Sequence, residues 1–253
     1  MQNKVIEYYE NYDEKGRLQR DNAHKIEYRT TIYYFDKLFK ANSKVLDVCA
    51  GTGAYSFYLA GKGHHVTACD LVPHNVEIIR ENINAGQLDD IQICNALDLS
   101  RFKDGSFDIV LCMGALYHLK DEHEKYMAVR ECGRVLKSGG LLILSYINKF
   151  ASIIMQVNGE LTNMDEATAI YTKKSDSVFT FTTPNEVEEM AGHCNVTAIH
   201  NIGTDGMVYA LGNRIKNASE QNFDKWLKYH ISTCEEPSIL GASLHGLYIG
   251  KKQ

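Results

Sequence analysis

A glycine-rich turn flanked by two acidic residues carries the clearest chemical signal in the sequence. The segment VLDVCAGTGAYS at 45–56 places Asp47 inside an apolar run, and Gly51 and Gly53 in the turn after it. Glycine permits a tight turn and a close approach of a ligand to the backbone. Asp70 ends the next apolar run, where a carboxylate can accept hydrogen bonds from ribose hydroxyls. This arrangement is typical of a nucleotide-binding site.

Short apolar runs that alternate with helical segments must position these residues. Buried strands that alternate with helices at this spacing indicate βαβ units and a parallel sheet covered on both faces. The sequence therefore predicts an α/β, Rossmann-like fold around a seven-stranded, mostly parallel sheet. The helix that begins near residue 121 is expected to end at Ser138-Gly139-Gly140, before the fifth strand. The predicted strands are 44–50, 64–70, 91–96, 107–114, 141–147, 195–203 and 245–251.

Two segments depart from this alternation. Residues 1–40 are helical in pattern and rich in aromatic side chains, and we expect them to form a lid over the domain at 41–253. A helical and loop insertion is expected at about 148–183, after the fifth strand. Both segments could close over a pocket at the sheet edge. The residues of the lid that could contact a substrate are Tyr8, Tyr9 and Tyr12.

Composition and charge limit the classes of protein to which the chain can belong. Hydrophobic residues make up 44% and charged residues 23% of the sequence, which suits an ordinary buried core. The formal net charge is -5 without a basic stripe, so nucleic acid is not an expected partner. Seven cysteines without C-x-x-C spacing predict reduced thiols, and neither a signal peptide nor a membrane-spanning run is found. We expect a cytoplasmic monomer or homodimer with no membrane partner.

The motif residues together resemble the class I S-adenosylmethionine-dependent methyltransferases over roughly residues 40–147. Asp47 and the glycines resemble the first motif of that family, Asp/Glu-x-Gly-x-Gly-x-Gly, and Asp70 resembles its ribose-binding acid. The segment FDIVLCMGALYHL resembles the fourth-strand motif, and LKSGGLLILS resembles the fifth strand. The resemblance implies S-adenosylmethionine as the cofactor. It also implies an antiparallel last strand, with 195–203 and 245–251 as the terminal pair.

The resemblance further implies which residues contact the cofactor. Asn95 falls where the family holds the adenine, often with an Asp, and Cys49 stands where the family has its first glycine. The Cys49 side chain either narrows the cofactor cleft or packs beneath it. One of Arg17, Arg20 and Arg29 is expected to pair with the methionine carboxylate. The residues expected to bind the cofactor are Asp47, Cys49, Ala50, Gly51, Thr52, Gly53, Asp70, Leu71, Asn95, Ala96, Leu97, Cys112, Met113 and Arg29.

A dinucleotide such as NAD is the alternative ligand for this fold. Its fingerprint, G-x-G-x-x-G, is not met, because Ser56 occupies the third position of the window that starts at Gly51. An acid inside the first strand is also atypical of dinucleotide sites. Asp47 could instead serve the methionine ammonium, directly or through water. The sequence therefore favours S-adenosylmethionine.

The candidate catalytic residues follow the fourth strand. Because a sulfonium methyl is already activated, placement of the acceptor supplies most of the rate, and a base is needed only if the acceptor must lose a proton. Tyr117 and His118 lie where open α/β sheets bind ligands, and His118 could deprotonate or orient an acceptor. A histidine that caps or packs the next helix is the alternative. No zinc-ligand spacing is present, so no metal is expected.

The sequence predicts methyl transfer to a small-molecule acceptor and leaves two alternatives open. A tRNA- or RNA-modifying methyltransferase would need a basic rim around the cleft, and the basic residues near the N-terminus are interleaved with acidic ones. A protein that binds S-adenosylmethionine without catalysis is the second alternative. The motif residues that are present argue against it.

Overall fold

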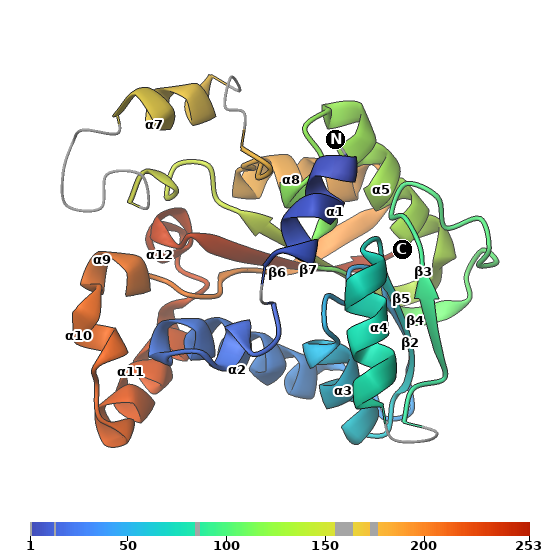
Figure 1. Cartoon of the computed structure of the whole chain (residues 1–253), viewed down its shortest axis with the longest axis horizontal. Coiled ribbons are helices and arrows are strands. Elements are labelled where there is room, and N and C mark those ends of the chain that lie inside the picture. The colour runs from blue at the N-terminus through green and yellow to red at the C-terminus, as the bar shows by residue number, and fades with distance from the viewer. Residues whose placement is uncertain (1, 13, 84–86, 155–163, 173–176) are drawn as a thin grey trace.

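A seven-stranded sheet forms the centre of the molecule (Figure 1), which is a computed structural model that describes residues 2–12, 14–83, 87–154, 164–172 and 177–253. The strand order is β3-β2-β1-β4-β5-β7-β6. Strand β7 is antiparallel to both of its neighbours, and the other paired strands are parallel, which confirms the predicted Rossmann-like sheet. The strands are β1 Lys44–Asp47, β2 His65–Asp70, β3 Asp90–Ile93, β4 Phe107–Cys112, β5 Leu136–Ile147, β6 Val196–Gly203 and β7 His245–Lys252.

Helices cover both faces of the sheet. Helices α5 and α8 pack on one face, whereas α2, α3 and α4 pack on the other. The helices are α1 Gln2–Glu10, α2 Asn22–Leu38, α3 Ala54–Gly61, α4 Pro73–Asn82, α5 Glu122–Val135, α7 Met164–Tyr171, α8 Pro184–Gly192, α9 Val208–Leu211, α10 Asn213–Lys216, α11 Glu220–Thr233 and α12 Pro237–Ala242, with short turns η1 Arg17–Gln19 and η2 Ala115–Tyr117.

The central strands are mostly apolar because successive residues contribute to two different cores. Leu46 and Val110 contribute to the core beneath α5 and α8. Their neighbours Val45 and Ile109 contribute to the core beneath α2, α3 and α4. Successive side chains of a strand point to opposite faces, so a strand covered on both faces is an unbroken apolar run. This pattern is the one from which the sequence predicts the sheet.

The fifth strand begins earlier than the sequence predicts. Helix α5 is followed directly by β5, so Ser138-Gly139-Gly140 lies inside the strand, and its prediction as a helix end is wrong. The pairing of β5 with β4 shifts register in this region. Gly139 has a φ of 76°, and a Cβ on Gly140 would lie 2.8 Å from the carbonyl oxygen of Asp108. The two glycines therefore permit an irregularity within one continuous strand.

The segments outside the sheet gather around its carboxyl edge. Helix α2 packs against α9, α10 and α11 through an apolar cluster that includes Ile26, Val208 and Phe223. Helix α1 lies apart from α2 and contacts α4 (Figure 1). Of the predicted insertion at 148–183, the structure describes α7 and its flanks, and residues 155–163 and 173–176 lie outside the described residues. No helix in the described part of the chain has the length and apolar character to cross a membrane.

Candidate active site

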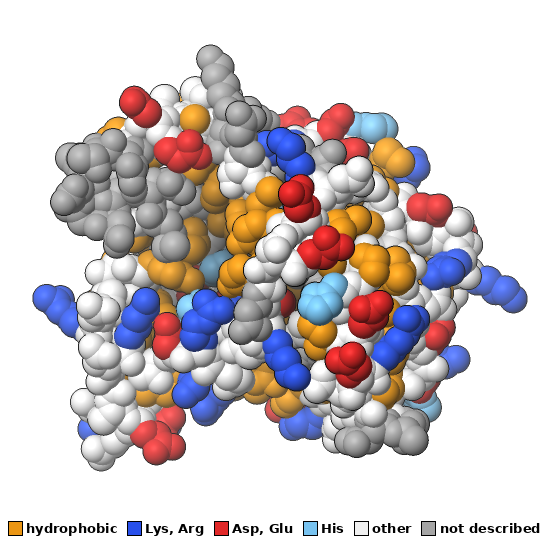
Figure 2. All heavy atoms as spheres, viewed as in Figure 1, with side chains coloured by type: hydrophobic (Ala, Val, Ile, Leu, Met, Phe, Trp, Pro, Cys, Tyr) orange, Lys and Arg blue, Asp and Glu red, His pale blue; other side chains and the backbone are white. Residues whose placement is uncertain are grey.

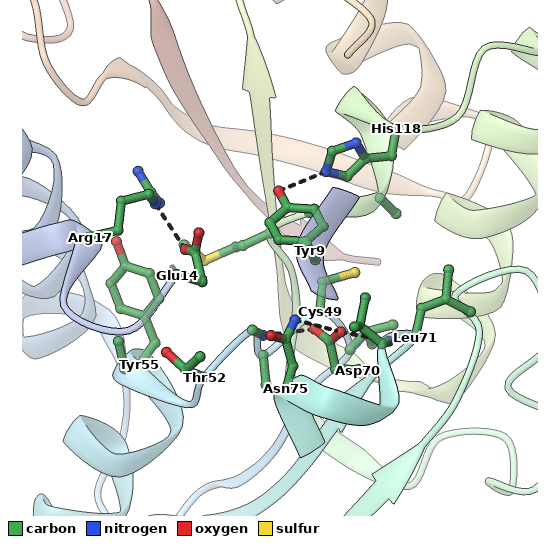
Figure 3. A pocket seen from close by; sticks show the side chains of 18 of the residues that line it. Tyr9, Glu14, Arg17, Cys49, Thr52, Tyr55, Asp70, Leu71, Asn75 and His118 are labelled. Carbon is green, nitrogen blue, oxygen red and sulfur yellow. Dashed lines mark hydrogen bonds and ion pairs between the residues drawn. The ribbon is translucent and has the colours of Figure 1, made fainter. Parts of the chain in front are cut away.

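A cavity of about 440 Å³, the first cavity, opens at the carboxyl ends of β1, β2 and β4. This is the edge at which open α/β sheets bind ligands. Residues that follow the strands form one wall, and the N-terminal segment forms the opposite wall (Figure 3). The strand-end residues of the lining are 48–52, 70–72, 94–96 and 113–115, and those of the N-terminal segment include Gln2, Val5, Tyr9 and 14–19.

Asp70 is held in the wall of this cavity by three hydrogen bonds (Figure 3). Its Oδ2 accepts from the backbone N–H of Gly51 at 2.7 Å. Its Oδ1 accepts from the backbone N–H of Val72 at 2.9 Å and from the side-chain amide of Asn75 at 3.1 Å. Burial raises the pKa of Asp70 to about 6, although these three donors oppose the rise. The glycine turn and the start of α4 thus fix one carboxylate at the tip of β2.

Asp47 lies beneath the cavity and is not part of its lining. Its carboxylate is 2% exposed and accepts a hydrogen bond from Oγ of Ser56, on α3, at 2.7 Å. Burial raises the pKa of Asp47 to about 7, and the nearby charge of Asp70 adds to the rise. Gly53, also outside the lining, precedes α3 with a φ of 88°. The sequence predicts that Asp47 and Gly53 contact the cofactor. In the structure both residues support the turn beneath the cavity, and neither lines it.

Cys49 lies at the junction of the cavity and the core. It lines the cavity and also packs against the core beneath α5 and α8. Its Cβ lies where a side chain on Gly114 would clash, only 2.6 Å from an ideal Cβ there. A hydrogen bond with Cys112 and burial raise the pKa of the Cys49 thiol. The thiol is therefore protonated near neutral pH and unreactive.

The other predicted cofactor contacts divide between the cavity and the core. Oδ1 of Asn95 accepts from the backbone N–H of Leu97 at 3.0 Å, so the side chain also stabilises its own loop. Leu97 and Cys112 pack into the core and do not line the cavity. The predicted residues that do line it are Cys49, Ala50, Gly51, Thr52, Asp70, Leu71, Asn95, Ala96 and Met113.

Arg17, and not Arg29, is the arginine that lines the cavity. Arg29, which the sequence assigns to the cofactor, is exposed on α2 and lies outside the lining of this cavity. The Arg17 guanidinium donates to Glu14 through Nε at 2.9 Å. Its two terminal nitrogens donate to the carboxylate of Glu27 at 3.0 and 3.2 Å. Burial would raise the pKa of Glu27, but Arg17 and His245 lower it to about 2. Arg17 is thus already paired on all three nitrogens.

Both ring nitrogens of His118 are already hydrogen-bonded. The hydroxyl of Tyr9 lies 3.0 Å from Nε2, and Nδ1 lies 3.1 Å from the carbonyl oxygen of Val178 (Figure 3). Because a carbonyl only accepts, Nδ1 carries the proton and Nε2 accepts from Tyr9. Burial lowers the pKa of His118 to about 4. Tyr117, the other candidate catalytic residue, donates to the carbonyl oxygen of Met113 at 3.0 Å. Neither residue presents a free proton acceptor to the first cavity.

A second cavity of about 340 Å³ adjoins the first. Tyr8, Tyr9 and Tyr12 all line it, as do residues from α2, β5 and β7. The rings of Tyr8 and Tyr12 are stacked with centroids 5.5 Å apart, and Tyr8 meets Phe179 edge-on at 5.5 Å. The residues that line both cavities are Tyr9, Glu14, Arg17, Tyr55, Met113 and Tyr117. Because they share these residues, the two cavities lie next to each other.

Several lining residues were not predicted from the sequence. Glu14 and Tyr55 come from a loop and from α3, and no local motif distinguishes them. Asn75 had a usable signal, because it lies in the first turn of the helix that begins at Pro73, directly after Asp70. The lining residues at the strand ends could therefore be predicted from the sequence more completely than those of the opposite wall.

Comparison with known proteins identifies a methyltransferase domain within the chain. Residues 46–144 match the family model described as a methyltransferase domain. A ubiquinone biosynthesis O-methyltransferase of Xanthomonas euvesicatoria is 36% identical over 129 residues, which are 51% of this chain and 51% of that protein. Its counterpart from Xanthomonas axonopodis is 37% identical over 118 residues, 46% of this chain and 48% of that protein. The chain thus spans about half the length of the curated relatives that it matches.

Solved structures agree on the fold. An S-adenosylmethionine-dependent methyltransferase from Methanosarcina mazei has a TM-score of 0.58 and 18% identity, and the match covers 87% of this chain and 96% of that chain. Identity this low supports the fold alone, whereas the family model and the Xanthomonas relatives support the sequence relationship. Residues 46–144 therefore form a methyltransferase domain by sequence, and the sheet as a whole has the Rossmann-like fold of an S-adenosylmethionine-dependent methyltransferase.

Proposed function

We propose that the chain transfers the methyl group of S-adenosylmethionine to a small-molecule acceptor. The observation that carries the proposal is the Asp70 carboxylate, fixed in the wall of the first cavity by Gly51, Val72 and Asn75. A carboxylate at the tip of the second strand suits the two hydroxyls of a ribose. The glycine turn at the end of β1 also supports the proposal. Because Gly51 has no side chain, a ligand in the same cavity can approach the backbone closely.

The chemistry of the lining fits the proposed cofactor. Next to Asp70, the apolar side chains of Leu71, Ala96 and Leu119 offer surface to an adenine ring. Among the described residues of the lining, Glu14, Asp70 and Glu124 bring three carboxylates to the cavity, against the two cationic groups of Lys15 and Arg17. An excess of negative charge suits a ligand that carries a sulfonium and an ammonium group. The volume of about 440 Å³ lies within the range usual for small-molecule sites.

When bound, S-adenosylmethionine supplies an activated methyl group, so the protein must chiefly bind, orient and shield. Helix α1 contributes Gln2, Val5 and Tyr9 to the lining, and it would exclude water from the methyl group. Figure 2 supports a small acceptor, because Lys and Arg side chains are interspersed with Asp and Glu on this face and hydrophobic side chains occupy its middle. A nucleic acid would need a continuous basic surface.

The cofactor assignment is tested by calorimetric titration of the protein with S-adenosylmethionine. Asp70→Ala is expected to weaken binding at least tenfold, since the ribose hydroxyls lose their acceptor. Asp89→Ala is the matched control, because Asp89 is an exposed acid paired with His65 and lies outside both cavities. Unchanged affinity in Asp70→Ala, with an intact fold by circular dichroism, would remove the assignment.

The acceptor is identified with methyl-labelled cofactor and fractionated cell extract. The Xanthomonas relatives are O-methyltransferases by name, which supports an oxygen acceptor here. A labelled product of low molecular mass is expected. Label that appears only in RNA would contradict the small-molecule proposal.

A further inference from the structure

A histidine–aspartate pair outside the family-model region faces the second cavity. His245 opens β7 and Asp205 follows β6, so the pairing of these strands brings the two side chains together. Nδ1 of His245 lies 2.6 Å from Oδ2 of Asp205. His245 lines the second cavity and its side chain is 21% exposed. The match to the methyltransferase domain ends at residue 144, so the pair belongs to the part of the chain that the family does not explain.

The surroundings of Asp205 fix the orientation of the imidazole. Asp205 is 1% exposed, and its Oδ1 accepts from Oγ of Ser243 at 2.5 Å and from the backbone N–H of His245 at 3.2 Å. An ionised carboxylate only accepts, so Nδ1 of His245 donates to it and Nε2 carries the lone pair. Among the described residues Nε2 has no hydrogen-bond partner. A carboxylate-oriented histidine with a free second nitrogen is the arrangement of a general base.

We propose that His245, positioned by Asp205, is the proton acceptor for an uncharged aromatic hydroxyl compound that binds in the second cavity. The inference rests on the proposed methyl transfer and specifies its acceptor and its base. His118 cannot fill this role in the described conformation, because Tyr9 and Val178 occupy its two nitrogens.

The walls of the second cavity suit an aromatic ring. Tyr8, Tyr12, Phe179 and Tyr209 line it, and aromatic side chains favour edge-on and offset contacts with a bound ring. Its charges disfavour an anionic acceptor. Within the part of the lining that the structure describes, the single guanidinium, that of Arg17, already pairs through all three nitrogens with Glu14 and Glu27, which leaves it less available to a carboxylate or phosphate group.

The charges around His245 strengthen it as a base. Burial lowers the pKa of His245, but Glu27 and Asp205 together raise it above its usual value, and Arg17 opposes them. His24 and Tyr209 are the other titratable groups of the lining near α2 and α9. A higher pKa means a stronger proton acceptor once the imidazole is neutral.

The proposed step balances as a displacement. The hydroxyl proton passes to Nε2 of His245 while the oxygen lone pair forms the bond to the methyl carbon. The bond between that carbon and sulfur breaks, and the electron pair stays on sulfur, which leaves as a neutral thioether. The two cavities share Tyr9, Tyr55, Met113 and Tyr117 in their linings, and the proposal requires the acceptor oxygen to reach the methyl group across this shared wall.

The test uses 4-nitrophenol, because its phenolate absorbs visible light and its neutral form does not. The cofactor-free wild-type protein is titrated at a pH below the pKa of the free phenol. Saturable binding with the visible absorbance of the phenolate is expected, since the proton moves to His245. In His245→Gln the ratio of phenolate to phenol among bound molecules should fall at least tenfold. Asp205→Asn should give a smaller loss, because the ring keeps its nitrogen but loses its orientation.

The matched control is His65→Gln, which removes the histidine of an exposed His–Asp pair whose Nδ1 to Oδ2 distance is 3.2 Å. It should leave the absorbance unchanged. An equal phenolate fraction in His245→Gln would overturn the role of His245, and a wild-type protein that does not bind 4-nitrophenol would overturn the acceptor class. If Asp205→Asn does not fold, the result for His245→Gln alone tests whether His245 is the proton acceptor. Calorimetric binding of S-adenosylmethionine, measured separately, shows whether the proposed function itself has failed.

Discussion

The hydroxyl of Tyr9 lies 3.0 Å from Nε2 of His118, and this contact joins the first helix of the chain to the turn after β4. The same imidazole is bonded to the backbone at Val178, so segments from three distant parts of the sequence meet at one ring. The ring of Phe179 packs against it with centroids 5.1 Å apart. Because Tyr9 lines both cavities, the position of α1 determines whether either of them is covered.

Removal of the Tyr9 hydroxyl should loosen α1 without unfolding the domain. A typical hydrogen bond contributes about 1 kcal/mol, so Tyr9→Phe should speed amide exchange in α1 by roughly fivefold. Hydrogen–deuterium exchange with mass spectrometry of residues 2–10 measures the change. Tyr33→Phe is the control, since Tyr33 is 44% exposed on α2 and lines neither cavity. Equal exchange in wild type and Tyr9→Phe would show that the contact does not hold the helix.

The sheet could be predicted because strands buried on both faces form apolar runs in the sequence. Which individual side chains at the strand ends point into the cavity could not be predicted. Asp47 is the last residue of β1 and Asp70 the last residue of β2, yet only Asp70 lines the cavity. Asp47 instead accepts from Ser56, and the sequence does not say which face of a strand end meets the ligand. Arg17 lines the cavity and Arg29 does not. This difference depends on how the whole N-terminal segment packs against the domain, which local sequence does not specify.

The His245–Asp205 pair illustrates a signal that was present in the sequence and not used. The predicted strands at 195–203 and 245–251 were expected to pair, and the structure confirms this. Antiparallel pairing brings the end of one strand beside the start of the other, so Asp205 and His245 had to be neighbours. What the sequence could not provide is the cavity, because α1, α2, α9 and the insertion that surround it come from separate parts of the chain.

Asp47 should make the stability of the ligand-free protein fall as the pH rises. Its pKa increases from 3.8 to about 7 on folding, so the native state binds the extra proton. The stability that protonation contributes is complete below pH 3.8 and is lost as the pH rises through 7. Asp47→Asn, which cannot ionise, should flatten this dependence and gain stability relative to wild type at pH 8. Urea unfolding from pH 5 to 8 measures it, and parallel curves for the two proteins would contradict the assignment.

Gly53 should resist substitution because of its backbone and its neighbours. Its φ is +88°, and a Cβ would lie 2.8 Å from the ring of Phe57 and 3.1 Å from Ile79. Gly53→Ala should therefore cost about 1–3 kcal/mol in the free energy of unfolding. Gly61→Ala, at the last residue of α3, is the control, since a Cβ there meets nothing within 4 Å, and it should be neutral or stabilising by up to about 1 kcal/mol. Equal losses in the two variants would mean that the turn tolerates a side chain.

Glu27 should stabilise the protein at neutral pH and lose that effect in acid. Its pKa falls from 4.5 to about 2 on folding because Arg17 and His245 favour the carboxylate over the cost of burial. The stability it contributes is present above pH 4.5 and is lost as the pH falls through 2. Glu27→Gln leaves Arg17 with Glu14 alone and should cost about 3 kcal/mol at pH 7, since breaking a buried pair strands a charge. The loss should shrink steadily in denaturation curves between pH 5 and 3.

The control for Glu27→Gln is the exposed pair of Lys62 and Asp36, whose side chains are 49% and 46% exposed. Lys62→Gln should cost much less stability than Glu27→Gln, because water screens the pair. The contrast separates burial from charge, since both substitutions remove one partner of an ion pair. If the two losses are equal at pH 7, the Arg17 network does not stabilise the wall that the two cavities share.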